Sequence, residues 1–101
     1  MSQNYIQDLA DDIRARVPRD LIPNDADQLF LIYAALALAK GERVDGRDVH
    51  NAWAAWMASG DPSHDSIKPY DELPVDVRNE DGPFVQAIRG AASALHDAQS
   101  T

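Results

Sequence analysis

The fold is decided by the stretch Leu29-Phe30-Leu31-Ile32-Tyr33-Ala34-Ala35-Leu36-Ala37-Leu38-Ala39. Wound into a helix, this stretch is apolar on nearly every face, and such a helix belongs in the centre of a domain. Its eleven residues are well short of the roughly 20 that cross a bilayer. We therefore expect a central helix whose most buried side chains include Leu29, Ile32, Tyr33 and Leu36.

Signals for both ends of this helix flank the apolar stretch. Asn24 or Asp25 is expected to cap its N-terminus, because both side chains accept hydrogen bonds from free backbone N–H groups. Asp27 falls in the first turn, where negative charge suits the helix dipole. Lys40 followed by Gly41 is typical of a helix C-terminus.

Apolar residues recur at spacings of three and four in three further segments, which predicts three more helices. The first covers about residues 4–17 and ends before Pro18, which has no backbone N–H to donate. Another covers about residues 46–59, and the last begins at Pro83. A short turn or helix is expected over residues 73–79.

No segment alternates apolar and polar residues as a half-buried strand does. The pattern therefore predicts an all-α fold: a compact four-helix domain with an irregular Pro/Tyr loop between helices three and four. A chain of 101 residues is one domain by length, so we expect a single domain over residues 1–101, with a frayed tail at about residues 98–101.

Charge and composition exclude several classes of partner. The formal net charge is -8, and a chain this acidic is expected to bind neither nucleic acid nor an anionic membrane. Cysteine is absent, which excludes disulfides and thiolate chemistry. The first residues lack the basic region and apolar run of a signal peptide, so we expect a cytoplasmic protein.

No catalytic or metal-binding set can be assembled from the sequence. The three histidines, His50, His64 and His96, lack partners at the spacing of a zinc site. His64-Asp65 matches a dipeptide of some metal-dependent phosphohydrolases, but their other ligands are missing. A nucleophile elbow and a phosphate-binding glycine loop are also missing. We expect a protein that is not an enzyme and has no cofactor and no metal.

Aromatic residues gather in and after the third predicted helix, where both tryptophans lie one helical turn apart. One interpretation is that they are core residues that hold the loop onto the helix. We expect Pro69 and Tyr70 to pack against this helix and His64 to make a structural hydrogen bond. The other interpretation is a partly open pocket that stacks a flat ligand such as a base, with Lys68 and either Arg78 or Arg89 available for its phosphates. On the second interpretation the ligand-binding residues are Trp53, Trp56, His64, Lys68, Tyr70 and Arg78.

Part of this region resembles the RyR domain, a repeat named after ryanodine receptors. Val49-His50-Asn51-Ala52-Trp53-Ala54 fits the V-H-x-x-W-A pattern of that family. The stretch from His64 to Pro74 keeps the spacing of H-P-x-L-x-P-Y-x-x-L-P, with Asp65 in place of the usual proline. Arg78 and Asp81 stand where a basic residue and an aspartate usually follow.

The resemblance covers about residues 49–90, and the Gly-Trp-x-Tyr-Gly segment of the family is missing between Trp56 and His64. The whole chain also resembles small uncharacterised proteins of mycobacterial phages. In bacteria, RyR-type modules are suspected of sensing nucleotide-derived signals in phage defence. The resemblance thus implies a phage-encoded binding protein that sequesters such a signal in the host cytoplasm.

A second hypothesis follows from the charge. An acidic helical surface favours a basic protein partner, so the protein would dock on a host protein and modulate it, with no small ligand. A chain this short often dimerises through a leftover apolar face, and a homodimer is compatible with either hypothesis.

Overall fold

The computed structural model of the chain describes residues 4–99. Its α-helices are α1 (Tyr5–Ala15), α2 (Asp27–Lys40), α3 (Gly46–Gly60), α4 (Val75–Asn79) and α5 (Gly82–Gln99). Three short 3₁₀ turns connect them: η1 (Arg19–Leu21), η2 (Gly41–Arg43) and η3 (Tyr70–Glu72). Residues 4–99 contain no strand, and four of the helices are long, which confirms the predicted all-α fold.

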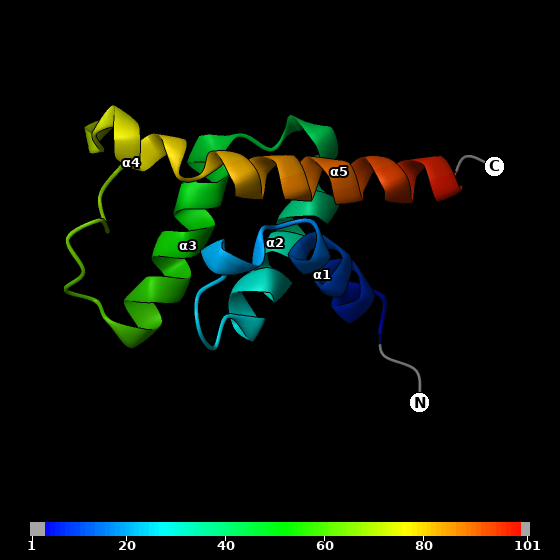
Figure 1. Cartoon of the computed structure of the whole chain (residues 1–101), viewed down its shortest axis with the longest axis horizontal. Coiled ribbons are helices and arrows are strands. Elements are labelled where there is room, and N and C mark those ends of the chain that lie inside the picture. The colour runs from blue at the N-terminus through cyan, green and yellow to red at the C-terminus, as the bar shows by residue number, and fades with distance from the viewer. Residues whose placement is uncertain (1–3, 100–101) are drawn as a thin grey trace.

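The long helices pack around α2, which contacts α1, α3 and α5. Figure 1 shows α5 along the long axis of the molecule, with α3 crossing it near its N-terminal end. None of the helices in the described part of the chain is long and apolar enough to span a membrane. α5 continues to Gln99, and the last two residues of the predicted frayed tail, 100 and 101, lie outside the described residues.

The burial of α2 follows one face and does not extend around the whole helix. Leu29 and Tyr33 are fully buried, as predicted, at 0% and 1% exposed. The prediction was wrong for Ile32 and Leu36, which are only partly buried, and Leu38 is 44% exposed. The neighbouring helices cover only part of the circumference of α2. They reach it on the side of Ala26, Leu29, Phe30, Tyr33, Ala34 and Ala37.

The start of α2 differs from the prediction, whereas its end does not. The N-cap is Ala26, which makes no side-chain capping bond, so neither Asn24 nor Asp25 caps the helix. Asp25 instead has a left-handed backbone, φ 55°, in the turn that brings Ala26 into the core at 0% exposed. At the other end Gly41 is the C-cap with φ 58°, a conformation that glycine adopts without steric cost.

The start of α3 is fixed by a capping box of two aspartates. The Asp45 side chain accepts from the Asp48 backbone N–H, and the Asp48 side chain accepts from the Asp45 N–H. Asp48 also pairs with Lys40 at 2.8 Å, which ties the end of α2 to the start of α3. Because η2 packs against α5, this short connection fixes α3 relative to both helices.

Candidate functional site

A pocket of about 380 Å³ opens between α2, α3 and the start of α5. The connection before α2 and the loop after α3 complete its walls. Most of its lining is apolar or aromatic, and its charged residues are both acidic, Glu80 and Asp81. The rings that face it belong to Tyr33, His50, Trp53, His64 and Phe84.

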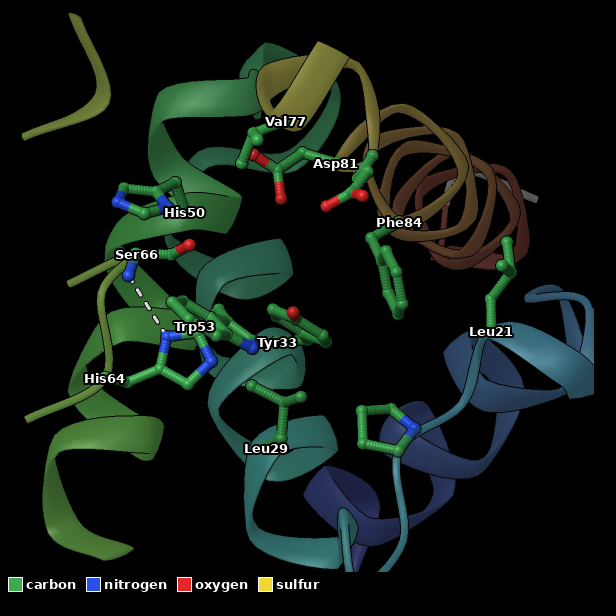
Figure 2. A pocket seen from close by; sticks show the side chains of 12 residues that line it. Leu21, Leu29, Tyr33, His50, Trp53, His64, Ser66, Val77, Asp81 and Phe84 are labelled. Atoms are coloured by element: carbon green, nitrogen blue, oxygen red, sulfur yellow. Dashed lines mark hydrogen bonds between the residues drawn. The ribbon is translucent and has the colours of Figure 1, made fainter. Parts of the chain in front are cut away.

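Two helices hold the largest rings on different sides of the pocket. Figure 2 shows Trp53 projecting from α3 on one side and Phe84 from α5 on the other, with Tyr33 of α2 between them. The Tyr33 and Phe84 ring centroids are 5.8 Å apart, and Tyr33 also meets Phe30 edge-on at 5.5 Å. Phe30 and Phe84 therefore hold the Tyr33 ring from two sides. The Trp53 side chain is less enclosed, because it is only partly buried.

His50 and His64 flank Trp53 and attach the loop to α3. His50 Nε2–H donates to the Lys68 carbonyl oxygen at 2.6 Å, and the His50 ring stacks on Trp53 at 5.8 Å. The His64 ring meets Trp53 edge-on at 5.2 Å, and its Nδ1 accepts from the Ser66 backbone N–H at 3.1 Å. The structural hydrogen bond predicted for His64 is thus confirmed.

Asp81 is the unusual polar group of the pocket. Figure 2 shows its carboxylate pointing into the space between the rings. Its Oδ2 is buried and accepts no hydrogen bond from the described residues. Burial raises the pKa of the Asp81 carboxyl to about 6, and Glu80 adds to this effect, whereas His50 opposes it. Burial, and then Asp81, raises the pKa of the Tyr33 hydroxyl, which keeps this group a neutral O–H.

The pocket brings together two of the six predicted ligand-binding residues, Trp53 and His64. Trp56 is outside the lining and packs against the hydrophobic core. The Lys68 side chain is exposed, and its backbone carbonyl is the partner of His50. Both tryptophans pack against the hydrophobic core, as the first interpretation has it, and Trp53 also lines the pocket.

Tyr70 and Arg78 lie together at the N-terminal end of α3, outside the pocket lining. The ring centroids of Tyr70 and His50 are 6.1 Å apart. The guanidinium groups of Arg47 and Arg78 lie 5.4 Å and 5.7 Å, respectively, from the centroid of the Tyr70 ring. Tyr70 thus packs against α3, as predicted, but it reaches Trp53 only through the intervening His50. Arg89, the other basic residue considered for phosphates, donates to the Val44 carbonyl at 2.6 Å.

Tyr33, Asp81 and Phe84 line the pocket but were not among the predicted site residues. Tyr33 was predicted only as a core residue, and Phe84 directly follows Pro83, where the last helix was predicted to begin. Asp81 carried a signal, since it belongs to the pattern shared with the RyR domain. Among residues 4–99, no group of three or more histidine, aspartate or glutamate side chains is arranged to hold a metal ion.

The fold and this pocket define a small all-α domain with an aromatic, acidic pocket between its helices. Residues 4–93 match the model of a family described as a domain of unknown function, DUF7701, and the chain belongs to this family. No curated protein and no solved structure matches the chain.

Proposed function

We propose that this protein is a small binding protein, not an enzyme, and that its pocket holds the flat ring of a nucleotide-derived ligand. The observation that carries the proposal is the pocket itself. Three large rings, those of Tyr33, Trp53 and Phe84, surround a space of about 380 Å³ whose lining is mostly apolar. Small-molecule sites have this character: mostly apolar walls with a few polar groups that fix orientation.

Stacking is the main source of affinity in this proposal. Trp53 is partly buried and held by His50 and His64, so its ring is positioned before a ligand arrives. A base that stacks on an aromatic side chain gains about 1–3 kcal/mol. Because the ring is already ordered, little of that gain is lost to fixing its rotamer.

The phosphates of such a ligand would stay outside the pocket. Lys68 and Arg78 are outside its lining, whereas Glu80 and Asp81 line it. A phosphate inside would meet two carboxylates, so the enclosed part of the ligand is the base or nucleoside. This places the recognition on the ring system and leaves the phosphates near solvent.

Binding without turnover is supported by the way the polar groups of the pocket are used. Ser66 and His64 are the pair that could supply a nucleophile and a base. His64 Nδ1, however, accepts the Ser66 backbone N–H, and this bond fixes the loop. A nucleophile needs the base within reach of its hydroxyl oxygen. The resemblance to RyR modules and to small phage proteins supplies the rest of the proposal: a phage-encoded protein that sequesters a signal in the host cytoplasm.

Tryptophan fluorescence tests the proposal, because the two tryptophans can be separated. Trp56→Phe leaves Trp53 as the reporter, and Trp53→Phe leaves Trp56, which is outside the pocket. We expect nucleosides to quench the Trp56→Phe protein and to leave the Trp53→Phe signal unchanged. Calorimetry at about 100 μM protein would detect even a micromolar site. Absence of heat for every nucleoside and nucleotide at that concentration contradicts the proposal.

The second candidate function is docking on a basic protein partner. A groove between α1, α2 and α5 has apolar walls that include Leu9 and Leu95, and an acidic edge at Asp8 and Asp12. Tyr5 and Leu38 in this groove are 72% and 44% exposed. Apolar walls with an acidic edge match the two faces of a basic amphipathic helix.

A labelled basic amphipathic peptide tests this candidate by fluorescence anisotropy. We expect binding that weakens with salt and with Leu38→Ser, while an acidic peptide of the same apolar pattern does not bind. Light scattering tests whether a second copy of the protein occupies the groove instead. If a second copy covers it, the wild type is a dimer and Leu38→Ser is a monomer.

A further inference from the structure

The charged side chains that line the pocket are all of one sign. They are two carboxylates, Glu80 and Asp81, and the lining contains neither a lysine nor an arginine. Glu80 is the carboxylate that a ligand can reach, because it is exposed, whereas the Asp81 Oδ2 is fully buried. Glu80 also takes part in no ion pair among residues 4–99. The pocket therefore offers a ligand a negative charge that no cation of its lining neutralises.

The basic side chain closest along the chain and the two histidines of the lining do not change this. The Arg78 guanidinium lies over the Tyr70 ring, 5.7 Å from the ring centroid, and Arg78 is outside the pocket lining. His64 Nδ1 accepts a backbone N–H, so the His64 ring is neutral in this arrangement. His50 uses its Nε2–H on a backbone carbonyl of the loop.

The rings that a ligand can touch favour the same kind of charge. Trp53 and Phe84 are both partly buried and face the pocket from α3 and α5, on different sides of it (Figure 2). The face of an aromatic ring carries partial negative charge and attracts a cation, most strongly in tryptophan. An anion on the ligand would be repelled by these faces and by Glu80. Both features therefore select a positively charged ring.

We propose, on the basis of the function proposed above, that the flat ring held between Trp53 and Phe84 carries a positive charge. Nucleotide derivatives contain such rings in two forms: a purine methylated on a ring nitrogen, and a nicotinamide joined through its ring nitrogen. In both forms the charge is spread over the ring, so the same group stacks on the aromatic side chains and is attracted by the Glu80 carboxylate. A space of about 380 Å³ is near the lower end of the range for ligand pockets and suits one ring system.

The test is calorimetry at pH 7 with two matched pairs of compounds. 1-Methylnicotinamide and 1-methyladenosine are cations at this pH, whereas nicotinamide and adenosine are their neutral counterparts without the methyl group. We expect each cation to bind about 10-fold more tightly than its neutral counterpart. Added salt should reduce this difference, because it screens the attraction between the cation and the exposed Glu80 carboxylate.

Two variants separate the charge of the pocket from the charge of the whole protein. Glu80→Gln and Asp76→Asn each replace an exposed carboxylate by its amide, and Asp76 lies on α4 outside the pocket lining. We expect Glu80→Gln to bind the two cations about 3-fold more weakly than the wild type and the neutral compounds equally well. Asp76→Asn should bind all four compounds as the wild type does. Thermal melting of the three proteins shows that they are folded.

Choline separates the charge of the ligand from its shape, because it carries a quaternary ammonium and no ring. We expect choline to bind more weakly than 1-methylnicotinamide, since it cannot stack between the two side chains. Choline binding as tight as that of 1-methylnicotinamide overturns the flat ring and assigns the pocket to an ammonium ligand.

The outcomes also separate this inference from the function on which it rests. A preference for the two cations that is reduced in Glu80→Gln and kept in Asp76→Asn supports the positive charge. The cation that binds more tightly then distinguishes the purine from the nicotinamide source. Equal binding of the cations and their neutral counterparts overturns the positive charge and keeps the stacking pocket. No binding of any of the compounds overturns both.

Discussion

Replacing Asp81 with asparagine should make the protein more stable at pH 7 and remove a pH dependence that the wild type shows between about pH 4 and pH 6. Burial raises the pKa of the Asp81 carboxyl from 3.8 to about 6. Below about pH 3 the carboxyl is protonated in the folded and unfolded states, and it costs nothing. As the pH rises, the unfolded chain releases the proton first, so the free energy of unfolding falls until about pH 6 and then levels off.

The size of this effect follows from the same pKa change. If the whole difference between the unfolded-state and folded-state pKa values counted, the charged carboxyl would destabilise the folded protein by about 3 kcal/mol at pH 7. Asp81 is half-buried, and solvent screens part of the interaction. We therefore expect the asparagine variant to gain about 1–2 kcal/mol at pH 7 and close to nothing at about pH 3.

Urea unfolding followed by circular dichroism measures this difference at several pH values from about 3 to 7. Asp48 and Asp71, whose pKa values are lowered, lose stability as the pH falls in every variant, so the difference between variants isolates Asp81. Asp76→Asn is the control for removing a charge and should follow the wild type. A stability difference between wild type and Asp81→Asn that stays constant with pH refutes the reasoning, and so does a less stable variant at pH 7.

Other substitutions test the packing, each measured by urea unfolding. Leu29→Ala should cost about 2–5 kcal/mol because Leu29 is fully buried, and Leu36→Ala less than half as much because Leu36 is partly exposed; equal losses would contradict the one-sided burial of α2. In Gly46→Ala the new Cβ would lie 2.5 Å from the Tyr70 hydroxyl, so Tyr70 must move and about 1–3 kcal/mol is lost. Gly60→Ala, in the same helix with open space around it, should be neutral or stabilising, by at most about 1 kcal/mol.

The helices could be predicted from the sequence because their signals are local. Spacings of three and four, Gly41 and the Asp81-Gly82-Pro83 break each act within one or two turns. The N-cap of α2 was predicted wrongly because the position of this cap depends on tertiary packing, which a local sequence pattern does not show. Placing Ala26 in the core needs a turn at Asn24 and Asp25, and this turn uses the residues that would otherwise cap the helix.

The buried face of α2 could not be predicted for a different reason. When apolar residues occupy every face, periodicity no longer distinguishes the side that faces the core. Ala34 and Ala37 are buried although they are the smallest side chains of the stretch, whereas the larger Leu36 and Leu38 are not. The packing of neighbouring helices decides this, and residue size or hydropathy in the sequence does not report it.

The candidate site was predicted in part, since its residues come from distant parts of the chain. Trp53 and His64 were found because they are close in sequence and both aromatic. Tyr33 of α2 and Phe84 of α5 join them only once the helices have packed. The same folding carries Tyr70 to the other side of His50, although it is six residues from His64 in the sequence.

The distribution of the basic residues explains why the pocket is acidic. Several of them are used in ion pairs with aspartates: Arg14 with Asp27, Arg16 with Asp12, Lys40 with Asp48, and Arg47 with Asp71. Arg89 is used on a backbone carbonyl. With only 9 basic residues against 17 acidic ones, these pairs leave few cations for other carboxylates. Glu80 and Asp81 therefore line the pocket, and neither a lysine nor an arginine stands beside them in its lining. A phosphate placed there would meet two carboxylates, which is why the function proposed above keeps phosphates outside the pocket.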